Sequence, residues 1–127
     1  MSDYVLDASA LLALLNEEKG ADIVQGLLST AVISSVNLAE VVTRLSRIGM
    51  PEDQIWDVLA YLGLETIPFV EEKSFQTGFL STSTHPIGLS LGDRACLSLA
   101  KAMAVTAVSA DRAWKDLNIG IEIHLIR

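Results

Sequence analysis

Short apolar runs alternate along the chain with longer stretches in which apolar residues recur every third or fourth position. The short runs predict strands and the longer stretches predict helices, because these are the repeats of the two structures. Their alternation predicts a single α/β domain over residues 1–127, with a parallel sheet covered by helices on both faces. The fourth strand, Ala-Val-Thr-Ala-Val-Ser, has no charged residue and is expected inside the sheet, whereas the fifth alternates and is expected at an edge. The five strands are expected at about residues 3–6, 31–34, 64–68, 104–109 and 122–126.

The clearest helical pattern covers residues 36–48, where apolar side chains from Leu38 to Leu45 fall on one face. Gly49 ends this helix and Pro51 opens the next, because proline suits the first turn of a helix. These two helices should form a hairpin, and any exposed apolar side chains on it would mark an interface with a partner. Further helices are expected at residues 8–15, 21–28, 71–80 and 93–103.

The amino-acid composition bears on function mainly through its excess of acidic residues. Nine Lys and Arg stand against sixteen Asp and Glu, for a net charge of −7, whereas domains that bind nucleic acid by neutralising phosphates are usually basic. Binding to RNA or DNA would therefore need added cations. One Cys and two His exclude a zinc cluster, and Cys96 is expected to be a buried thiol in a reducing compartment. With no plausible membrane span and no visible signal peptide, a cytoplasmic location is expected.

Four acidic residues stand at or just beyond the carboxyl ends of predicted strands, where open α/β sheets place their ligands. Asp7 and Asp111 directly follow strands, although both positions equally suit the N-cap of a helix. Asp93 heads the apolar stripe of its helix, where a carboxylate is costly unless it caps the helix, pairs or binds a metal. The fourth is Glu40, which lies on the helix at residues 36–48.

Glu40 shares a helix face with Arg44 and Arg47. An ordinary ion pair between Glu40 and Arg44, four residues apart, would explain this arrangement. The two arginines could equally supply cationic contacts beside an acidic cleft. Four carboxylates at one rim would repel each other and raise their own pKa values, and a divalent cation relieves that conflict. Oxygen ligands without Cys or His clusters favour Mg²⁺ or Mn²⁺ over Zn²⁺.

Each acid lies in a short segment with a recognisable pattern. The segments cover residues 5–15, 34–41, 89–97 and 108–114 and contain the strings Leu-Asp-Ala-Ser, Asn-Leu-Ala-Glu, Gly-Asp-Arg-Ala and Ser-Ala-Asp-Arg. In order and spacing they resemble the motifs of PIN-domain ribonucleases, most of all the VapC-type toxins of bacterial toxin–antitoxin pairs. The resemblance covers essentially the whole chain. It implies a parallel sheet in the order 3-2-1-4-5 with the acids clustered at one end.

The resemblance also implies roles for individual residues. Among the four acids it makes Asp7 and Asp93 the direct metal ligands. Three polar residues match positions that orient carboxylates or a phosphate oxygen through hydrogen bonds. The catalytic quartet is Asp7, Glu40, Asp93 and Asp111, the orienting residues are Ser9, Asn37 and Ser109, and the candidate RNA contacts are Arg44, Arg47, Arg94 and Arg112.

The activity implied by the resemblance is Mg²⁺-dependent hydrolysis of RNA phosphodiesters, with Mn²⁺ able to substitute. Asp111 and Glu40 would complete the metal shell through waters or a second ion, and the products would carry 5′-phosphate and 3′-hydroxyl groups. Members are commonly homodimers, and the C-terminal segment of the antitoxin offers a basic residue to the acidic pocket. The expected partners are therefore an RNA substrate and a cognate VapB-like antitoxin, in a homodimer or a toxin–antitoxin hetero-oligomer.

Two other interpretations stay open at this point. The chain could be a catalytically inactive PIN-like domain that serves only as a binding module. It could also be a phosphotransfer or phosphatase α/β domain with Asp7 as the acceptor. Against the latter, the phosphatase pattern has a second Asp where Ser9 stands, and a receiver domain has a Lys where Ser109 and Asp111 stand. Trp56 and Trp114 are expected to be core or interface anchors.

Overall fold

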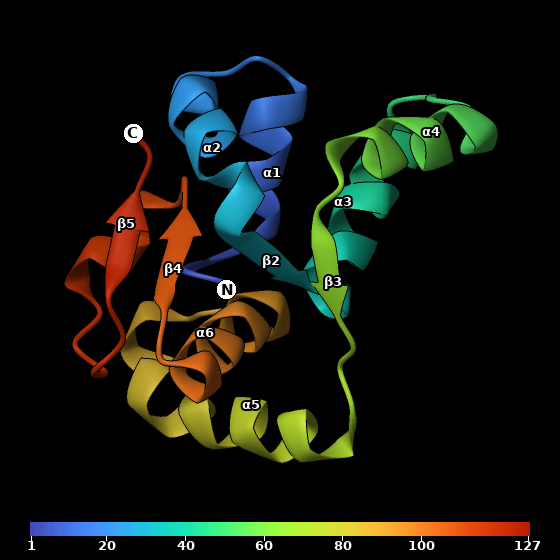
Figure 1. Ribbon diagram of the computed structural model, residues 1–127. Coiled ribbons are helices and arrows are strands. Elements are labelled where there is room, and N and C mark those ends of the chain that lie inside the picture. The colour runs from blue at the N-terminus through green and yellow to red at the C-terminus, as the bar shows by residue number, and fades with distance from the viewer.

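A parallel five-stranded sheet forms the centre of the computed structural model, which describes residues 1–127 (Figure 1). Its strand order is β3-β2-β1-β4-β5, and every neighbouring pair is parallel. The predicted fold class and strand order are thereby confirmed, with β4 inside the sheet and β5 at an edge. The order also differs from the 2-1-3-4-5 order of receiver domains. The strands are β1 (Tyr4–Leu6), β2 (Ala31–Ser34), β3 (Glu65–Ile67), β4 (Thr106–Ser109) and β5 (Ile123–Leu125).

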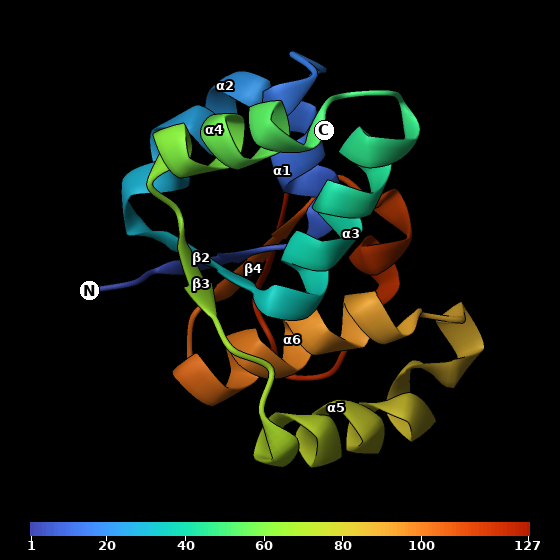
Figure 2. The ribbon, with the colours of Figure 1, turned by 90° about the vertical axis from the view of Figure 1, so that its right-hand side faces the viewer.

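Six α-helices cover the two faces of the sheet. Figure 2 shows α5 and α6 below the sheet and α1, α2 and α4 above it. None of the helices combines the length and the apolar character that a membrane span requires. The helices are α1 (Ala8–Leu15), α2 (Ala21–Leu27), α3 (Ser35–Arg47), α4 (Glu52–Leu62), α5 (Glu71–Thr84) and α6 (Leu91–Met103), with 3₁₀ turns η1 (Leu28–Thr30), η2 (His85–Ile87) and η3 (Arg112–Asp116).

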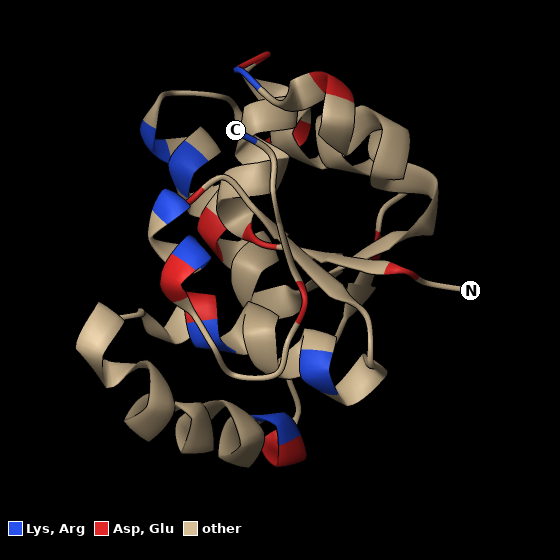
Figure 3. Cartoon of the chain, turned by 90° about the vertical axis from the view of Figure 1, so that its left-hand side faces the viewer, with Lys and Arg blue, Asp and Glu red and all other residues tan.

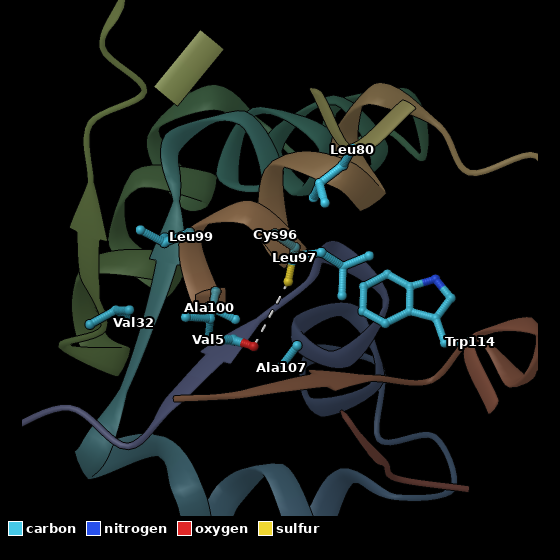
Figure 4. Packing of buried hydrophobic residues seen from close by; sticks show 9 residues of the cluster. All are labelled: Val5, Val32, Leu80, Cys96, Leu97, Leu99, Ala100, Ala107 and Trp114. Carbon is cyan, nitrogen blue, oxygen red and sulfur yellow. Dashed lines mark hydrogen bonds between the residues drawn. The ribbon is translucent and has the colours of Figure 1, made fainter. Parts of the chain in front are cut away.

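The core divides between the two faces because successive side chains of a strand point in opposite directions. Val5 belongs to a cluster with residues of α6, whereas the next residue, Leu6, packs with α1 and α2. Trp114 and Cys96 are both fully buried in the cluster on the α6 side (Figure 4). The prediction of a buried thiol is confirmed, and Trp114 is a core anchor.

The predicted hairpin of α3 and α4 is present, and Gly49 makes its turn with a positive φ of 96°. Two other predicted helix boundaries were wrong. Helix α6 begins at Leu91 rather than at residue 93, because Ser90 caps it. Helix α5 continues to Thr84 rather than ending at Leu80, since Thr84 is buried and its hydroxyl donates to the Leu80 carbonyl at 2.8 Å.

Candidate functional site

Asp7 lies where the central strand β1 passes into α1, and it is buried, with 3% of its surface exposed. Its side chain caps α1 by accepting the Ala10 amide proton at 2.8 Å. The hydroxyl of Ser9 donates to Oδ1 at 2.7 Å, and the hydroxyl of Ser109 donates to Oδ2 at 2.5 Å. Both carboxylate oxygens are therefore hydrogen-bonded, but every donor is electrically neutral.

This surrounding changes the acidity of Asp7. Burial raises the pKa of Asp7 from 3.8 to about 6, and the negative charge of Asp93 adds to the increase. The hydrogen bonds from Ser109, Ser9 and the Ala10 amide lower the pKa, without offsetting burial. The one ion pair of the protein joins Arg127 to Glu18, so no cationic side chain pairs with Asp7. A buried carboxylate without a cationic partner is a chemical fit for a bound cation.

A network of hydroxyl groups joins the ends of β1 and β4 around Asp7. The Oγ atoms of Ser9 and Ser109 lie 3.3 Å apart. Ser9 Oγ accepts the Ala110 amide proton at 2.9 Å, and Ser109 Oγ accepts that of Asp111 at 3.0 Å. Both serines singled out in the sequence therefore contact Asp7, and each is itself held by the backbone after β4.

Asp93 and Asp111 stand at the same edge of the sheet, and both also cap helical turns. Ser90 and Asp93 form a capping box, in which Asp93 Oδ2 accepts the Ser90 amide proton at 3.0 Å. Asp111 is exposed, and its Oδ1 accepts the Ala113 amide proton at the start of η3 at 3.0 Å. The capping interpretation therefore holds for Asp7, Asp93 and Asp111, although each carboxylate has further lone pairs available.

Glu40 is linked to the first turn of α6 through hydrogen bonds of Asn37, and it is not paired with an arginine. The side-chain amide of Asn37, which is only 1% exposed, donates to Glu40 Oε1 at 2.8 Å and to the Gly92 carbonyl at 3.0 Å. Asn37 Oδ1 is buried and has no hydrogen-bond partner. The ordinary alternative of a Glu40–Arg44 ion pair is not what the structure contains.

The pKa of the Cys96 thiol responds to three of the four candidate acids. Burial raises the pKa of its thiol most, and the charges of Asp7, Asp93 and Glu40 raise it further. The charges of these three acids therefore reach the interior of α6, whereas the side chain of Asp111 caps η3. In the structure, no set of three or more His, Cys, Asp and Glu side chains lies close enough to hold a metal ion.

The four candidate arginines have different surroundings. Arg44 and Arg47 are exposed on α3 and line, with Ala8 and Glu40, an open hollow of about 810 Å³. Figure 3 shows acidic and basic positions gathered along one side of the molecule. Arg112 is also exposed, but Arg94 donates to the Thr77 carbonyl at 3.1 Å and so ties α6 to α5. The local role of Arg94 competes with the predicted contact to RNA.

A separate apolar cleft lies between α3 and α4. It has a volume of about 540 Å³, and six of its eight lining residues are hydrophobic, among them Leu38, Val42 and Trp56. Trp56 is 73% exposed, in contrast to the buried Trp114, so it is a surface residue rather than a core anchor. The exposed apolar side chains that would mark an interface on this hairpin are therefore present.

Gly92 was missed by sequence reasoning and is part of the site. It precedes Asp93 in the first turn of α6, is buried, and lies against the carboxylate of Glu40. The sequence carried no clear signal, because the predicted helix began at residue 93 and left Gly92 outside it, where a glycine is ordinary.

Comparison with known proteins gives a family and a fold. The family model described as PIN domain matches residues 4–119. No curated protein matches the chain by sequence. Among solved structures, DNA-bound VapBC from Salmonella typhimurium superposes with a TM-score of 0.77, at 19% identity over 100% of both chains. VapBC2 from Rickettsia felis, bound to a promoter DNA fragment, gives a TM-score of 0.71 at 23% identity over 95% of this chain and 96% of that one. VapBC-5 from Mycobacterium tuberculosis gives 0.58 at 19% identity over 100% and 99%.

Proposed function

The chain belongs to the PIN-domain family, and we propose that it is the toxin of a VapBC-type pair, a metal-dependent ribonuclease that a cognate antitoxin restrains. The observation that carries the proposal is Asp7, a buried carboxylate with a raised pKa and neutral donors only, whose pKa the negative charge of Asp93 raises further. The PIN-domain match favours this role of Asp7 over that of a phosphoryl acceptor, and the sheet order differs from that of receiver domains.

The side-chain donors at this edge are all oxygen atoms, which are the ligands that a hard divalent cation prefers. Asp7 and Asp93 would bind it directly, and Glu40 and Asp111 would bind it through water, with Asp93 and Asp111 turning from the amides they cap. When bound, Mg²⁺ or Mn²⁺ polarises a phosphoryl oxygen and lowers the pKa of water. The hydroxyls of Ser9 and Ser109 hold the Asp7 oxygens in place, at 2.7 and 2.5 Å.

RNA reaches this acidic edge through local positive charge. Arg44 and Arg47 line the hollow beside Glu40, so they bind phosphates that flank the reacting one. Arg112 is exposed near Asp111 in the chain and extends the same contact. With water as the attacking group, the products carry 5′-phosphate and 3′-hydroxyl ends.

The antitoxin is proposed to occupy the cleft between α3 and α4. An amphipathic segment would bury apolar side chains against Leu38, Val42 and Trp56. A basic residue of that segment would suit a protein of charge −7 and its acidic edge. The comparisons support such a partner, because the similar structures are described as VapBC complexes. We further propose a cytoplasmic protein that forms a homodimer or a toxin–antitoxin hetero-oligomer.

The test uses two variants and one matched control. Purified, folded Asp7→Asn and Asp93→Asn should lose Mg²⁺-dependent RNA cleavage and the growth arrest that expression causes. Asp116→Asn removes an equal charge from the exposed acid of η3 and should keep both. Cleavage by both variants at the wild-type rate, or full activity in EDTA, would overturn the proposal. A wild-type protein without a thermal shift on addition of Mg²⁺ or Mn²⁺ would favour the inactive binding module.

A further inference from the structure

Gly92 occupies a position in α6 where a side chain would collide with the Glu40 carboxylate as the structure places it. A Cβ atom built on it would lie 2.6 Å from both Cδ and Oε2 of Glu40, and still closer to Oε1, whereas real Cβ atoms essentially never come within 3.0 Å of another heavy atom. Gly92 has an ordinary helical backbone, so its conformation does not call for glycine. The feature that requires glycine here is therefore the Glu40 carboxylate.

Asn37 holds the same carboxylate by a hydrogen bond. Its amide donates to Glu40 Oε1 at 2.8 Å and to the carbonyl of Gly92 at 3.0 Å, so one buried NH₂ group bridges α3 and α6. Glu40 itself is exposed and would otherwise sample several rotamers. The space left at Gly92 admits the rotamer that the structure contains, and the hydrogen bond from Asn37 stabilises it.

We propose that Gly92 is a positioning residue for Glu40, acting with Asn37 to hold the carboxylate against the first turn of α6 beside Asp93. This inference rests on the proposed function, because its consequence is the placement of Glu40 toward the metal ion and its waters. Gly92 touches the carboxylate rather than substrate, so it acts only through Glu40.

Stability and site geometry should respond differently to a side chain at this position. The atoms that a new methyl group would meet are the far end of a flexible side chain, which can swing into solvent at the cost of the hydrogen bond from Asn37. Gly92→Ala should therefore fold, while Glu40 leaves its place. Residues that orient metal ligands typically contribute about 10- to 100-fold in metal affinity or activity. We expect Mn²⁺ affinity and kcat to fall about 10-fold, with KM for RNA unchanged.

The experiment is a double-mutant cycle of Gly92→Ala and Glu40→Ala, measured by Mn²⁺ titration calorimetry, RNA cleavage and thermal melting without metal. Gly78→Ala is the matched control, because Gly78 is also helical and a Cβ there meets nothing within 4 Å. Gly92→Ala should weaken Mn²⁺ binding in the native background and change nothing further once Glu40 is alanine. Gly78→Ala should leave binding unchanged.

Melting without metal separates this inference from the proposed function. Gly92→Ala should raise Tm more in the Glu40→Ala background than in the native one, because the collision is then gone and only the helix preference for alanine remains. Equal changes in Tm in the two backgrounds would overturn the inference, whether or not the wild type cleaves RNA. A loss of Mn²⁺ affinity that persists in the Glu40→Ala background would overturn it as well.

Discussion

Replacing Asp7 by asparagine should make the protein more stable at neutral pH while it removes the proposed activity. Asparagine keeps an oxygen for the Ser9 hydroxyl and the Ala10 amide, and its NH₂ group can donate to the hydroxyl of Ser109. What changes is the charge, which the wild-type protein holds in a buried position.

The magnitude follows from the shift in acidity. The pKa of Asp7 rises from 3.8 to about 6 on folding. About two pKa units at roughly 1.4 kcal/mol each correspond to about 3 kcal/mol. Because the pKa is higher in the folded state, the folded protein binds more protons than the unfolded chain. This stabilisation is fully present below pH 3.8 and is lost as the pH rises through about 6.

The assay is thermal and urea unfolding of wild type and Asp7→Asn in EDTA, from pH 4 to pH 8. The two proteins should have similar stability at the acid end, and the variant should exceed the wild type by up to about 3 kcal/mol at the neutral end, or roughly 10 °C in Tm. Asp116→Asn, the exposed control, should follow the wild type within about 0.5 kcal/mol. Addition of Mg²⁺ should then stabilise the wild type and Asp116→Asn, but not Asp7→Asn. A variant no more stable than the wild type at pH 8 in EDTA would refute this reasoning.

Three further changes test other parts of the site. Ser109→Ala removes a hydrogen bond that lowers the pKa of the buried carboxylate, so the pH at which stability is lost should move upward in metal-free melts; an unchanged midpoint would count against that role. Arg44→Ala and Arg47→Ala should each reduce the steepness of log affinity for RNA against log salt concentration, by about 0.7 for each phosphate that is no longer neutralised. The measurement is fluorescence anisotropy between roughly 50 and 200 mM salt. Unchanged slopes would show that neither arginine contacts RNA. Trp56→Ala should weaken antitoxin binding by about 2 kcal/mol in calorimetry and leave RNA cleavage intact. Tyr61→Ala is the control, because Tyr61 is exposed and lies outside the cleft, and it should change neither antitoxin binding nor cleavage.

The elements of the fold could be predicted from the sequence because strands and helices impose different apolar repeats. Their exact ends depended on contacts that the repeats do not contain. The capping box of Ser90 and Asp93 starts α6 two residues earlier than its apolar stripe suggests. Burial of Thr84 extends α5 through a Ser- and Thr-rich segment with poor helix propensity. The strand order came from the family resemblance, since alternation alone permits several orders.

The acids of the site could be located because parallel strands bring their carboxyl ends to one edge. The side chains that surround each acid could not be predicted from the sequence, because they come from segments that are distant along the chain. Asn37 joins Glu40 to Gly92, 55 positions away from Asn37, and this contact replaces the expected pair with Arg44. Arg94 was expected to face RNA, and its bond to the Thr77 carbonyl arises only when α5 packs on α6.

The reactivity of the buried Cys96 thiol reports how often α6 separates from the sheet. Cys96 belongs to α6, its sulfur lies 3.9 Å from the Val5 carbonyl oxygen of β1, and both burial and the charges of nearby acids disfavour its thiolate form. A dissolved thiol reagent can reach it only while α6 is lifted from β1. The rate at which Cys96 is labelled under native conditions therefore measures how often the segment that carries Asp93 and Gly92 opens. A ligand that binds at the acidic edge should slow this labelling.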